Sequence, residues 1–383
     1  MSPARLRVMI DLSSAVRHGA GIGRYAAELA RALLAELPPD ESLEAFTAGG
    51  GARRLPAPLA GLPAKTRGED GRRWRLRVML AHLLRHGQDA ALGRPGVFLA
   101  ADHVLPYLTE ARSLFVLYDL TFQLFPQAHQ PLNRWFSTLM VPRFARRAGA
   151  VLAISEATRR DALRHYRLPA ERLHVVYPGV AEHFQPVANA DQLATIRRRY
   201  ALPARFVLFV GTLEPRKNLP TALRAFRAAA PPEVGFVIAG QAGWRAQATL
   251  AAIRDLGLEA RVGFCGYVPD EDLPALYTLA EALLFPSLYE GFGLPPLEAM
   301  ACGAPVLASN TSSLPEVVGE AGLTLPPDQP QAWAEALARV FDDAVLRAEL
   351  SERGRRQAAR FRWATAARQV RELYRRPIPD PHQ

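Results

Sequence analysis

Short apolar runs alternate with helix-like segments along the whole chain. Apolar runs of this kind, bounded by polar and turn-forming residues, are typical of buried strands. Their regular alternation with helical patterns predicts parallel sheets covered by helices, an α/β fold. The expected strands are residues 6–12, 43–49, 97–100, 113–119, 150–155 and 174–179 in the first half, and 205–211, 235–240, 261–268, 282–288, 304–309 and 322–325 in the second.

A polar stretch with two prolines separates these two sets of strands. At 383 residues the chain exceeds one typical core, so we expect two domains joined there. The last helical stretch, residues 361–376, is amphipathic. The expected division is a first domain at 1–180, a linker with a short helix at 181–204, a second domain at 205–360 and a final segment at 361–383.

Composition narrows the class of protein. Apolar residues make up 49% of the chain, enough for two cores, yet no run approaches the ~20 apolar residues of a membrane-spanning helix. The first residues carry charge and no long apolar segment, so we expect no secretory signal. Cys265, Cys302 and the nine histidines show no metal-ligand spacing. We therefore expect a cytoplasmic protein without a structural metal.

The positive charge is concentrated in the first half. Residues 1–200 hold 28 Lys and Arg against 17 Asp and Glu, whereas residues 201–383 hold 19 against 20. A general preference for arginine would have raised both halves, so the difference needs a local cause. An anionic membrane surface, a phosphorylated acceptor and nucleic acid are the candidate partners.

Two segments of the first half stand out. Residues 50–75 are rich in Gly, Pro and Arg and predict a surface loop. The following segment, 72–87, contains no acid and predicts a helix. Its main apolar side chains share one face, with arginines around them: Leu76, Met79, Leu80 and Leu83. Two interpretations stay open, a helix lying in a membrane interface and a helix packed on the sheet with its arginines in solvent.

Charged residues follow two expected strands of the second half. Arg216 and Lys217 come after the apolar run 205–213, in a loop that leads into the next helix. Open α/β sheets bind ligands at the carboxyl ends of their strands, and adjacent cations suit a pyrophosphate. Glu290 lies in a Gly-rich loop after another strand, and Glu298 is near the start of the next helix. Two cations for a diphosphate and two carboxylates for hydroxyl groups match a nucleotide sugar.

Four motifs occur in order within residues 206–325: VGTLEPRKN, GYVPDEDLPALY, PSLYEGFGLPPLEAMACGAPVLAS and LPEVVGEAG. This stretch resembles the donor-binding half of retaining glycosyltransferases of the GT-B fold, and in particular bacterial lipopolysaccharide and phosphatidylinositol mannosyltransferases. The resemblance implies two Rossmann-like domains facing across a cleft that closes over the donor. It also implies that the final segment crosses back to pack on the first domain.

The resemblance assigns roles to the four charged residues. Arg216 and Lys217 would stabilise the charge on the departing nucleoside diphosphate, in place of the divalent metal that other glycosyltransferases use. Glu298 would accept hydrogen bonds from the ribose hydroxyls, and Glu290 would lie close to the donor sugar. Their structural alternatives are a solvated turn for the cations and a favourable helix-dipole contact for Glu298.

Backbone groups complete the expected donor site. The glycines of the second-half loop would let its N–H groups approach the sugar or phosphate. In the first half, the GAGIGRY loop (19–25) opens a helix and would face the donor phosphates, although a lone G-x-G is weak evidence. By resemblance, the donor-binding positions besides Glu298 are Gly21, Gly23, Gly211, Val268, Phe292, Gly293 and Leu294.

Tyr118 departs from the family pattern. Members of the family have His-Asp after this strand, whereas this chain has Tyr118 and Asp119. A phenol with a pKa near ~10 cannot replace imidazole as a base near neutral pH. Three interpretations stay open: Tyr118 contacts the sugar or acceptor, Asp119 or His103 takes over, or the site has reduced activity. Retaining transfer can also pass the acceptor proton to the departing phosphate oxygen.

The sequence therefore predicts a retaining hexosyltransferase without metal or cofactor. We expect GDP-mannose as donor and a lipid-linked or oligosaccharide acceptor in surface-glycan synthesis, with the basic half facing the inner membrane surface. The alternatives are a UDP-hexose donor, an epimerase or phosphorylase on the same fold, and a nucleotide-sugar or glycan-binding subunit with impaired catalysis. Nucleic-acid binding is disfavoured because it leaves the four motifs unexplained.

Overall fold

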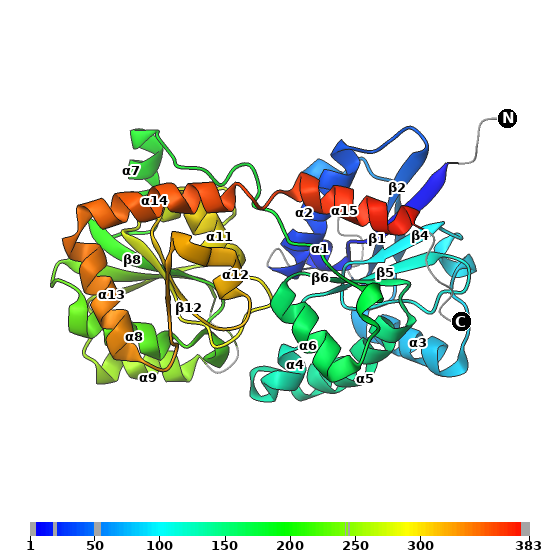
Figure 1. Ribbon diagram of the computed structural model, residues 1–383, viewed down its shortest axis with the longest axis horizontal. Coiled ribbons are helices and arrows are strands. Elements are labelled where there is room, and N and C mark those ends of the chain that lie inside the picture. The colour runs from blue at the N-terminus through cyan, green and yellow to red at the C-terminus, as the bar shows by residue number, and fades with distance from the viewer. Residues whose placement is uncertain (1–4, 18–20, 50–54, 242, 244–245, 377–383) are drawn as a thin grey trace. The chain divides into compact units, whose positions relative to one another are not determined.

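The computed structural model divides into two compact units, each built on its own parallel sheet (Figure 1). It describes residues 5–17, 21–49, 55–241, 243 and 246–376. Unit 1 comprises Met1–Gln123, Gln130–Gly179 and Arg362–Gln383, and unit 2 comprises Leu124–His129 and Val180–Phe361. The expected α/β class with two Rossmann-like domains is confirmed.

Unit 1 contains a seven-stranded parallel sheet among the described residues, in the order β3-β2-β1-β4-β5-β6-β7. In its centre Ile10 pairs with Ala45 on one side and Leu99 on the other. The strands are β1 (Leu6–Asp11), β2 (Glu41–Ala48), β3 (Ala64–Arg67), β4 (Val97–Ala100), β5 (Arg112–Leu117), β6 (Ala150–Ala153) and β7 (Leu173–Val175). Because the strands are parallel, their carboxyl ends share one edge.

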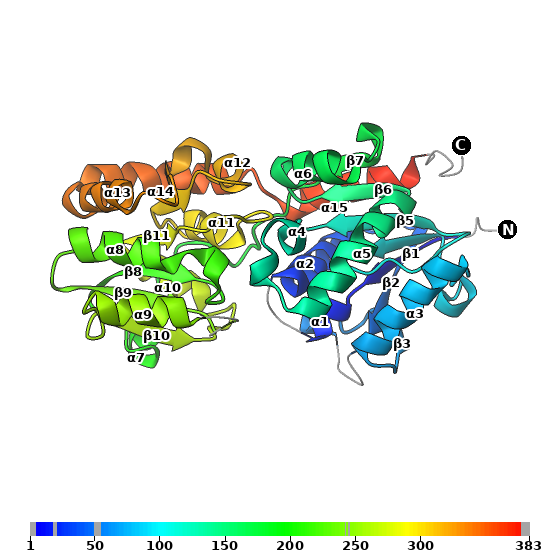
Figure 2. The same cartoon turned by 90° about the horizontal axis from the view of Figure 1, so that it is seen from below.

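Helices cover both faces of this sheet. The α-helices are α1 (Ser13–Arg17), α2 (Ile22–Ala35), α3 (Gly71–Leu84), α4 (Thr121–Leu124), α5 (Pro131–Arg147), α6 (Glu156–Tyr166) and α15 (Trp363–Arg375). Short 3₁₀ turns occur in unit 1 at η1 (Ala57–Leu59), η2 (Ala90–Leu92) and η4 (Ala170–Arg172), whereas η3 (Pro126–Ala128) belongs to unit 2. Helices α2 and α15 lie on one face of the sheet, and α3 and α5 lie on the other (Figures 1 and 2).

The segment expected as a loop, residues 50–75, is largely ordered. Residues 50–54 lie outside the described part, but residues 64–67 form β3, and Thr66 pairs with Thr47 of β2. An edge strand has only one neighbour, and β3 alternates exposed and half-buried residues. A short polar sequence can therefore form a strand there without the apolar run that marks a central one.

The final helix α15 packs within unit 1 and closes over a buried carboxylate. Glu41, the first residue of β2, has no exposed side-chain surface. It accepts a hydrogen bond from Tyr374 Oη at 2.6 Å and pairs with Arg375 Nε at 2.6 Å. The apolar side of α15 contacts α2, with Val370 among its buried residues. A buried ion pair thus attaches the end of the described chain to its beginning.

Unit 2 contains a six-stranded parallel sheet among its described residues, in the order β10-β9-β8-β11-β12-β13. The strands are β8 (Arg205–Val210), β9 (Val234–Ala239), β10 (Val262–Gly266), β11 (Ala282–Phe285), β12 (Val306–Ser309) and β13 (Leu323–Leu325). Strands β9 and β11 are fully buried, and β8 is buried between its half-buried end residues Arg205 and Val210, as expected for a sheet covered on both faces.

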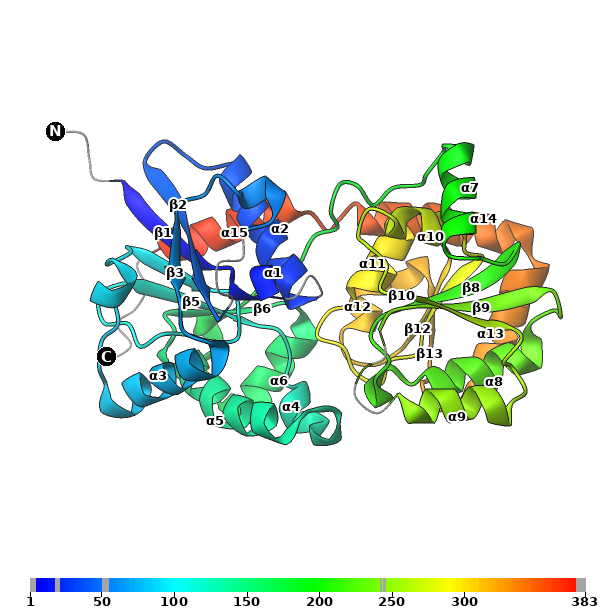
Figure 3. The ribbon, with the colours of Figure 1, turned by 180° about the vertical axis from the view of Figure 1, so that it is seen from behind.

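The helices of unit 2 also form two layers. Helices α8, α9 and α13 lie on one face, and α10, α11 and α14 on the other (Figure 3). The elements are α7 (Ala190–Arg199), η5 (Pro215–Lys217), α8 (Leu219–Ala229), α9 (Gln247–Asp255), α10 (Leu273–Leu279), α11 (Leu294–Ala301), α12 (Leu314–Val318), η6 (Gly319–Ala321), α13 (Pro330–Asp342) and α14 (Ala344–Ala358). Within the described ranges, no helix of either unit combines the length and the apolar character needed to cross a membrane.

The segment expected as an interdomain linker, residues 181–204, belongs to unit 2. It contains the expected short helix, α7, which packs on α10. Buried Asp272 accepts hydrogen bonds from Arg199 at 2.7 Å and from Tyr200 at 2.6 Å. A polar segment can be part of a domain when its polar side chains form hydrogen bonds and ion pairs with that domain, as Arg199 and Tyr200 do with Asp272.

Candidate active site

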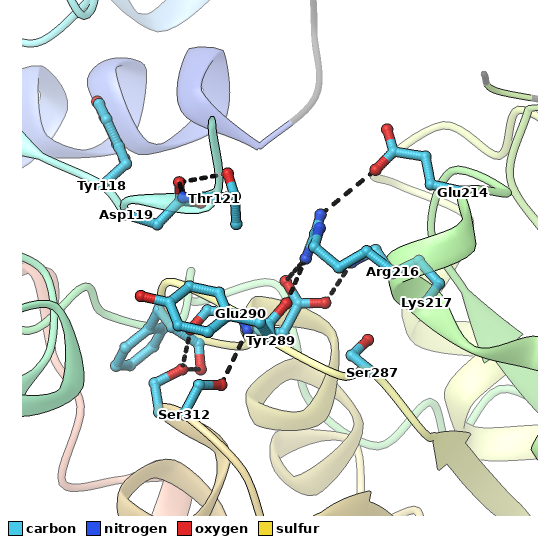
Figure 4. Close-up of polar contacts among 12 residues, drawn as sticks. Tyr118, Asp119, Thr121, Glu214, Arg216, Lys217, Ser287, Tyr289, Glu290 and Ser312 are labelled. Carbon is cyan, nitrogen blue, oxygen red and sulfur yellow. Dashed lines mark hydrogen bonds and ion pairs between the residues drawn. The ribbon is translucent and has the colours of Figure 1, made fainter. Parts of the chain in front are cut away.

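Two cations and one carboxylate meet at the carboxyl ends of β8 and β11 in unit 2 (Figure 4). Arg216 and Lys217 lie in η5, and Glu290 lies in the loop after β11. Glu290 Oε1 is 2.6 Å from Lys217 Nζ, and its Oε2 is 2.8 Å from Arg216 Nη1. None of the three side chains is more than 15% exposed. Residues 73 positions apart in the sequence thus form one buried charged cluster.

The two cations control the ionisation of Glu290. Burial alone would raise the pKa of this carboxyl, but the charges of Arg216 and Lys217 outweigh burial and lower its pKa to about 2. Burial also lowers the pKa of the Lys217 ammonium. Arg216 remains charged at any working pH. Glu290 is therefore an anion that holds two cationic side chains in place before any ligand arrives.

Other contacts keep these cations rigid. Arg216 Nη1 donates to the carbonyl of Tyr289 at 2.6 Å, and the Arg216 carbonyl accepts from the N–H of Leu288 at 2.8 Å. The Lys217 ammonium lies 4.9 Å from the centre of the Phe285 ring. The guanidinium and ammonium groups are thus held in fixed positions, as electrostatic stabilisation of a developing charge requires.

A glycine pair allows the ends of β8 and β9 to approach each other beside Lys217. Predicted donor-site residue Gly211 has a φ of +148°, and a Cβ on it would lie 3.6 Å from Lys217 Cε. At Gly240, with a φ of +157°, a Cβ would lie 1.9 Å from the Gly211 carbonyl oxygen. Only glycine fits at position 240, because any side chain would push the two strand ends apart.

Two serines hold the Gly-rich loop after β11. Ser312 Oγ accepts from the Glu290 N–H at 2.9 Å. The Ser313 hydroxyl donates to the Phe292 carbonyl at 2.6 Å and lies 2.9 Å from the Glu290 carbonyl. Gly293, with a φ of +118°, precedes α11. These contacts order the loop that carries the predicted backbone donors.

The side chains of Phe292 and Leu294 in this loop are buried or half-buried. Phe292 is 3% exposed, and its ring lies 5.6 Å from that of Phe361. Leu294, the first residue of α11, is half-buried. Phe292 is therefore a core residue of unit 2, and its predicted contact with a donor rests on its backbone N–H alone.

Glu298 lies on α11 with its carboxylate oriented by a tyrosine. The hydroxyl of Tyr277, on α10, donates to Glu298 Oε2 at 3.0 Å, and both side chains are almost fully buried. Sequence analysis did not single out Tyr277, although it ends the GYVPDEDLPALY motif. The sequence feature that could have identified Tyr277 is its hydroxyl on an otherwise apolar helix face, because a buried hydroxyl needs a hydrogen-bond partner.

The segment that holds the predicted donor-binding residue Val268 forms an edge of unit 2. Val268 is 6% exposed, whereas the neighbouring aromatic residues Phe264 and Tyr267 are 50% and 53% exposed. Strand β10 is an edge strand with an irregularity between Phe264 and Gly266. The role of Val268 stays a prediction, and exposed aromatic rings lie next to it.

Tyr118 in unit 1 is a core residue. It is 6% exposed, and its hydroxyl donates to the Ala101 carbonyl at 2.8 Å. Burial raises the pKa of the phenol well above its ordinary value. The ring packs edge-on against Tyr25 and His103, both with centroids 5.1 Å away. Its hydroxyl already has a structural partner in the Ala101 carbonyl. The predicted sugar or acceptor contact of Tyr118 stays a prediction, and the burial of the side chain does not favour it.

Asp119 and His103 follow neighbouring strands of unit 1. Asp119 is half-buried, and its Oδ1 accepts from the N–H of Thr121 at 2.9 Å and from its hydroxyl at 2.6 Å (Figure 4). This turn begins α4, so one carboxylate oxygen has a structural role. His103 is half-buried, with a φ of +47° in the loop after β4. Both roles stay predictions.

The predicted glycine loop of unit 1 is described only in part. Residues 19 and 20 of GAGIGRY lie outside the described residues. Gly21 is exposed, precedes α2 with a φ of +47°, and has open space where a Cβ would lie. Gly23 is buried within the first turn of α2. Gly21 thus has an exposed position and a backbone conformation that favours glycine, and the donor roles of both glycines stay predictions.

A pair of buried carboxylates in unit 1 escaped the sequence analysis. Asp11 ends β1, and Asp102 follows β4, the neighbouring strand. Asp11 Oδ1 accepts from the N–H of Ser13 at 2.9 Å and from its hydroxyl at 2.5 Å. Arg17 forms an ion pair with Asp102. The sequence pattern that could have predicted the pair is an acid after each of two apolar runs, because the carboxyl ends of parallel strands lie at one edge of the sheet.

Burial controls the ionisation of this pair. It raises the pKa of Asp11 to about 8, with the charge of Asp102 adding to the shift. It also raises the pKa of Asp102 to about 6, against the opposing charges of Arg17 and Arg75. Asp11 Oδ2 is buried and has no hydrogen-bond partner within the described part of the chain. Asp11 is therefore a carboxyl that binds a proton near neutral pH.

Comparisons with known proteins agree with this geometry. Residues 195–357 match the family model described as "Glycosyl transferases group 1", and residues 19–184 match "Glycosyltransferase Family 4". "O-antigen chain mannosyltransferase B" of Escherichia coli is 31% identical over 283 residues, which cover 73% of this chain and 74% of that protein. The "Serotype-specific mannosyltransferase WbdA" of Escherichia coli is 34% identical over 228 residues, which cover 58% of this chain and 28% of that protein.

Solved structures share the fold. Sucrose-phosphate synthase from Thermosynechococcus elongatus matches with a TM-score of 0.75 at 22% identity, covering 97% of this chain and 98% of that chain. HepE of Anabaena, in complex with UDP and glucose, matches with a TM-score of 0.75 at 20% identity, covering 96% and 99%. In the described residues no group of three or more His, Cys, Asp or Glu side chains is arranged to hold a metal ion. Two family matches, a mannosyltransferase relative over most of both chains and the shared architecture establish that the chain belongs to the group 1 glycosyltransferases of the GT-B fold.

Proposed function

We propose that this glycosyltransferase moves mannose from GDP-mannose, with retention of configuration, to a lipid-linked or oligosaccharide acceptor in surface-glycan synthesis. The observation that carries the proposal is the buried cluster of Arg216, Lys217 and Glu290 at the carboxyl edge of the unit 2 sheet. The choice of mannose is supported by the E. coli relatives, which are named as mannosyltransferases.

The donor diphosphate binds at the two cations. Arg216 presents a planar guanidinium that suits phosphate oxygens, and Lys217 adds a point charge. Charge builds up on the leaving GDP as the bond between the sugar and the phosphate breaks, and both groups stabilise it without a metal ion. Glu290, freed in part from its cations by the phosphate, accepts a hydrogen bond from a sugar hydroxyl.

The acceptor proton goes to the departing phosphate oxygen. An acceptor hydroxyl oxygen forms the new bond to the sugar carbon on the face that GDP leaves, and its proton passes to the GDP oxygen released there. This path needs no imidazole base, which is consistent with a tyrosine in the core at position 118. Asp119 and His103 orient the acceptor in this proposal.

The nucleoside is held by the second half of the donor site. Glu298, oriented by Tyr277, accepts hydrogen bonds from the ribose hydroxyls. Backbone N–H groups of the loop at Gly293 bind the phosphate or sugar. Gly21 approaches the donor phosphates from its turn before α2.

A second candidate donor is a UDP-hexose. HepE, which shares the fold, is described in complex with UDP and with glucose. Relatives named D-inositol 3-phosphate glycosyltransferase, one of them 33% identical over 238 residues, have a different activity from the mannosyltransferases. The two candidate donors therefore differ in the nucleotide base, guanine in GDP-mannose and uracil in a UDP-hexose.

The test is thermal stabilisation of the full chain by GDP, UDP, ADP and their hexose derivatives. A nucleotide at a hundredfold excess over its dissociation constant raises the free energy of unfolding by about 2.7 kcal/mol. We expect GDP and GDP-mannose to raise the melting temperature of the wild type but not of Arg216→Ala or Glu298→Ala. Arg198→Ala, which removes an exposed arginine on α7, is the matched control and keeps the response.

Turnover completes the test. Release of GDP from GDP-mannose is measured with mannose-containing oligosaccharides as acceptors. Stabilisation by UDP alone would replace the donor with a UDP-hexose. Saturable binding without turnover on any acceptor would favour the binding subunit with impaired catalysis, and no response to any nucleotide would overturn the donor-site assignment.

A further inference from the structure

Helix α3 of unit 1 exposes a row of leucines to solvent. Leu76, Leu80 and Leu83 follow one another at the i, i+4, i+7 spacing of a single helix face. They are 51%, 45% and 60% exposed, and Leu84 beside them is 74% exposed. Isolated exposed leucines are common on proteins, but a continuous row of them marks an interaction surface.

The opposite face of α3 makes its contact with the rest of unit 1. Trp74, Val78 and Ala81 are buried there, at the same i, i+4, i+7 spacing. The sequence left open whether the leucine face packs on the sheet or lies in a membrane interface. The structure assigns sheet packing to the other face, so the leucine row has no covering element among the described residues.

Arginines surround the leucine row. Arg72, Arg73, Arg77 and Arg85 of this segment are exposed. The two acids nearest in sequence each pair with one of these arginines: Glu69 with Arg77 at 3.1 Å, and Asp70 with Arg73 at 3.6 Å. Arg72 and Arg85 add positive charge beyond these two pairs. The helix itself contains no acid. The surface is therefore both apolar and positively charged.

The first turn of α5 extends this surface. Leu132 and Trp135 are 62% and 55% exposed, and Arg134 between them is exposed. The two helices lie on the same face of the unit 1 sheet (Figure 2). Arg75 of α3 joins them, because its Nη1 donates to Asn133 Oδ1 at 2.9 Å. The first turn of α5 thus lies beside α3.

The exposed apolar side chains are concentrated here. Ten large apolar side chains are exposed within the described residues, and six of them belong to these two helices. They are Leu76, Leu80, Leu83, Leu84, Leu132 and Trp135, called the leucine–arginine surface here together with the arginines named above. The other four are Leu250, Phe264, Tyr267 and Val345, all in unit 2.

We propose that the leucine–arginine surface binds an anionic phospholipid bilayer. The proposal rests on the lipid-linked acceptor of the proposed function and names the surface that meets the membrane. Leucines enter the boundary between head groups and acyl chains, arginines pair with lipid phosphates, and Trp135 takes the interfacial position that indole prefers. The excess of positive charge in residues 1–200 adds long-range attraction to the same anionic surface.

The charges favour a bilayer over a second protein. A protein partner for an apolar face usually leaves charges at the rim and depletes them from the centre. Here exposed arginines lie at both ends of the leucine row, Arg72, Arg73 and Arg77 in the first half of α3 and Arg85 just after its end. They can reach lipid phosphates when the helix lies parallel to a membrane. The two chemistries fit the two layers of a bilayer surface, apolar beneath and anionic above.

The experiment is co-sedimentation of the full chain with vesicles. One set contains phosphatidylcholine alone, and the other contains phosphatidylcholine with phosphatidylglycerol. We expect binding to the anionic vesicles only, weakened by salt because the arginine contribution is screened. The triple variant Leu76→Gln/Leu80→Gln/Leu83→Gln should lose at least about tenfold in partitioning. Arg72→Gln/Arg73→Gln should lose about 25-fold, since each arginine contributes about fivefold.

The controls separate this proposal from the proposed function. Val345→Gln and Leu250→Gln remove exposed apolar side chains of unit 2 and should bind vesicles like the wild type. All surface variants should keep the thermal response to the donor nucleotide, because they leave the donor cluster intact. A wild type that stays in the supernatant with anionic vesicles, or a triple variant that binds as well as the wild type, overturns the proposal. A concentration-dependent dimer lost in the triple variant would replace the bilayer with a second copy.

Discussion

Two buried carboxylates, Glu290 in unit 2 and Asp11 in unit 1, lie at the carboxyl edges of similar parallel sheets. Their pKa values move in opposite directions, to about 2 for Glu290 and to about 8 for Asp11. Burial acts on both in the same sense, towards a higher pKa. Glu290 differs because two cations contact it, whereas Asp11 has another carboxylate, Asp102, as a neighbour.

The difference shows how one architecture provides two kinds of edge. In unit 2 the edge is an ionised cluster with cations in place, which suits a diphosphate that carries its own negative charge. In unit 1 the edge holds a carboxyl that gains or loses a proton near neutral pH. The fold supplies the position, and the neighbouring side chains determine the charge.

The largest expected effect concerns a third buried carboxylate, Glu41, which resembles Glu290 in having cationic partners. Besides the partly exposed Arg375, Glu41 pairs at 3.7 Å with Arg371, whose side chain is 16% exposed. Removing one partner from such a buried ion pair costs about 3–5 kcal/mol, because the other charge is left without compensation. Glu41→Ala should lower the free energy of unfolding by that amount in urea denaturation. Glu44→Ala, whose own side chain is 22% exposed where that of Glu41 is fully buried, is the matched control and should cost far less. Equal losses in both variants would show that α15 does not depend on the buried pair.

The second effect is catalytic and tests the cationic edge of unit 2. Arg216→Ala should lower kcat by about 10²–10³-fold, the usual cost of removing one group that stabilises transition-state charge. Arg216→Lys should recover part of this loss, because it restores charge without the planar fork. Steady-state kinetics with the nucleotide-sugar donor measures both. A kcat within threefold of the wild type in Arg216→Ala would mean that Lys217 alone handles the diphosphate.

The third effect is the pH dependence of stability, which has opposite signs for the two carboxylates. The folded state holds the Asp11 proton up to about pH 8, whereas an ordinary aspartate loses it near pH 3.8, so this group makes stability fall as pH rises through that window. The slope is at most about 1.4 kcal/mol per pH unit. Asp11→Asn should flatten it, as followed by melting temperature between pH 5 and pH 8 (about three units). An unchanged slope would contradict the shift.

Glu290 provides the opposite case. Its pKa falls from 4.5 to about 2, so its stabilising contribution is complete above pH 4.5 and is lost as pH falls towards 2. Glu290→Gln should remove part of the acid-side loss of stability and leave the slope near neutral pH unchanged. Melting temperatures between about pH 3 and pH 5 measure this contribution. An acid-side slope equal to that of the wild type would mean that other carboxylates dominate there.

The smallest expected effect concerns Tyr277. Tyr277→Phe removes one hydrogen bond to the buried Glu298 carboxylate, worth about 1.5 kcal/mol or roughly tenfold. If the hydroxyl positions the carboxylate for ribose, the KM for the donor should rise while kcat changes little. Tyr200→Phe, which loses a hydrogen bond to Asp272 on the same unit, is the control and should keep the wild-type KM. A fall in stability with an unaltered KM would make Tyr277 purely structural.

The sequence was enough to predict the α/β class and to place the candidate donor residues after strands of the second sheet. The apolar runs are long and regular, and the motifs that hold Arg216, Lys217, Glu290 and Glu298 follow strands directly. Parallel pairing then brings these loops to one edge of the sheet, because the carboxyl ends of parallel strands coincide. In unit 2 the apolar strand pattern and the observed sheet agree, so the pattern left few alternative positions for the charged loops.

Only the tertiary structure decided the surroundings of individual side chains. The sequence made Tyr118 a candidate contact for a sugar or acceptor and the leucines of α3 a candidate contact for a membrane. In the structure Tyr118 is buried, whereas Leu76, Leu80 and Leu83 are exposed. The partners of Glu290 and Asp11 are 73 and 91 residues away in the chain, so no local pattern could reveal which carboxylate meets cations and which meets another acid. The sequence by itself determined the class of fold and the positions of the charged loops. Burial and contacts between distant segments decided the ionisation of those charges and which apolar face remained exposed, because both depend on packing in three dimensions.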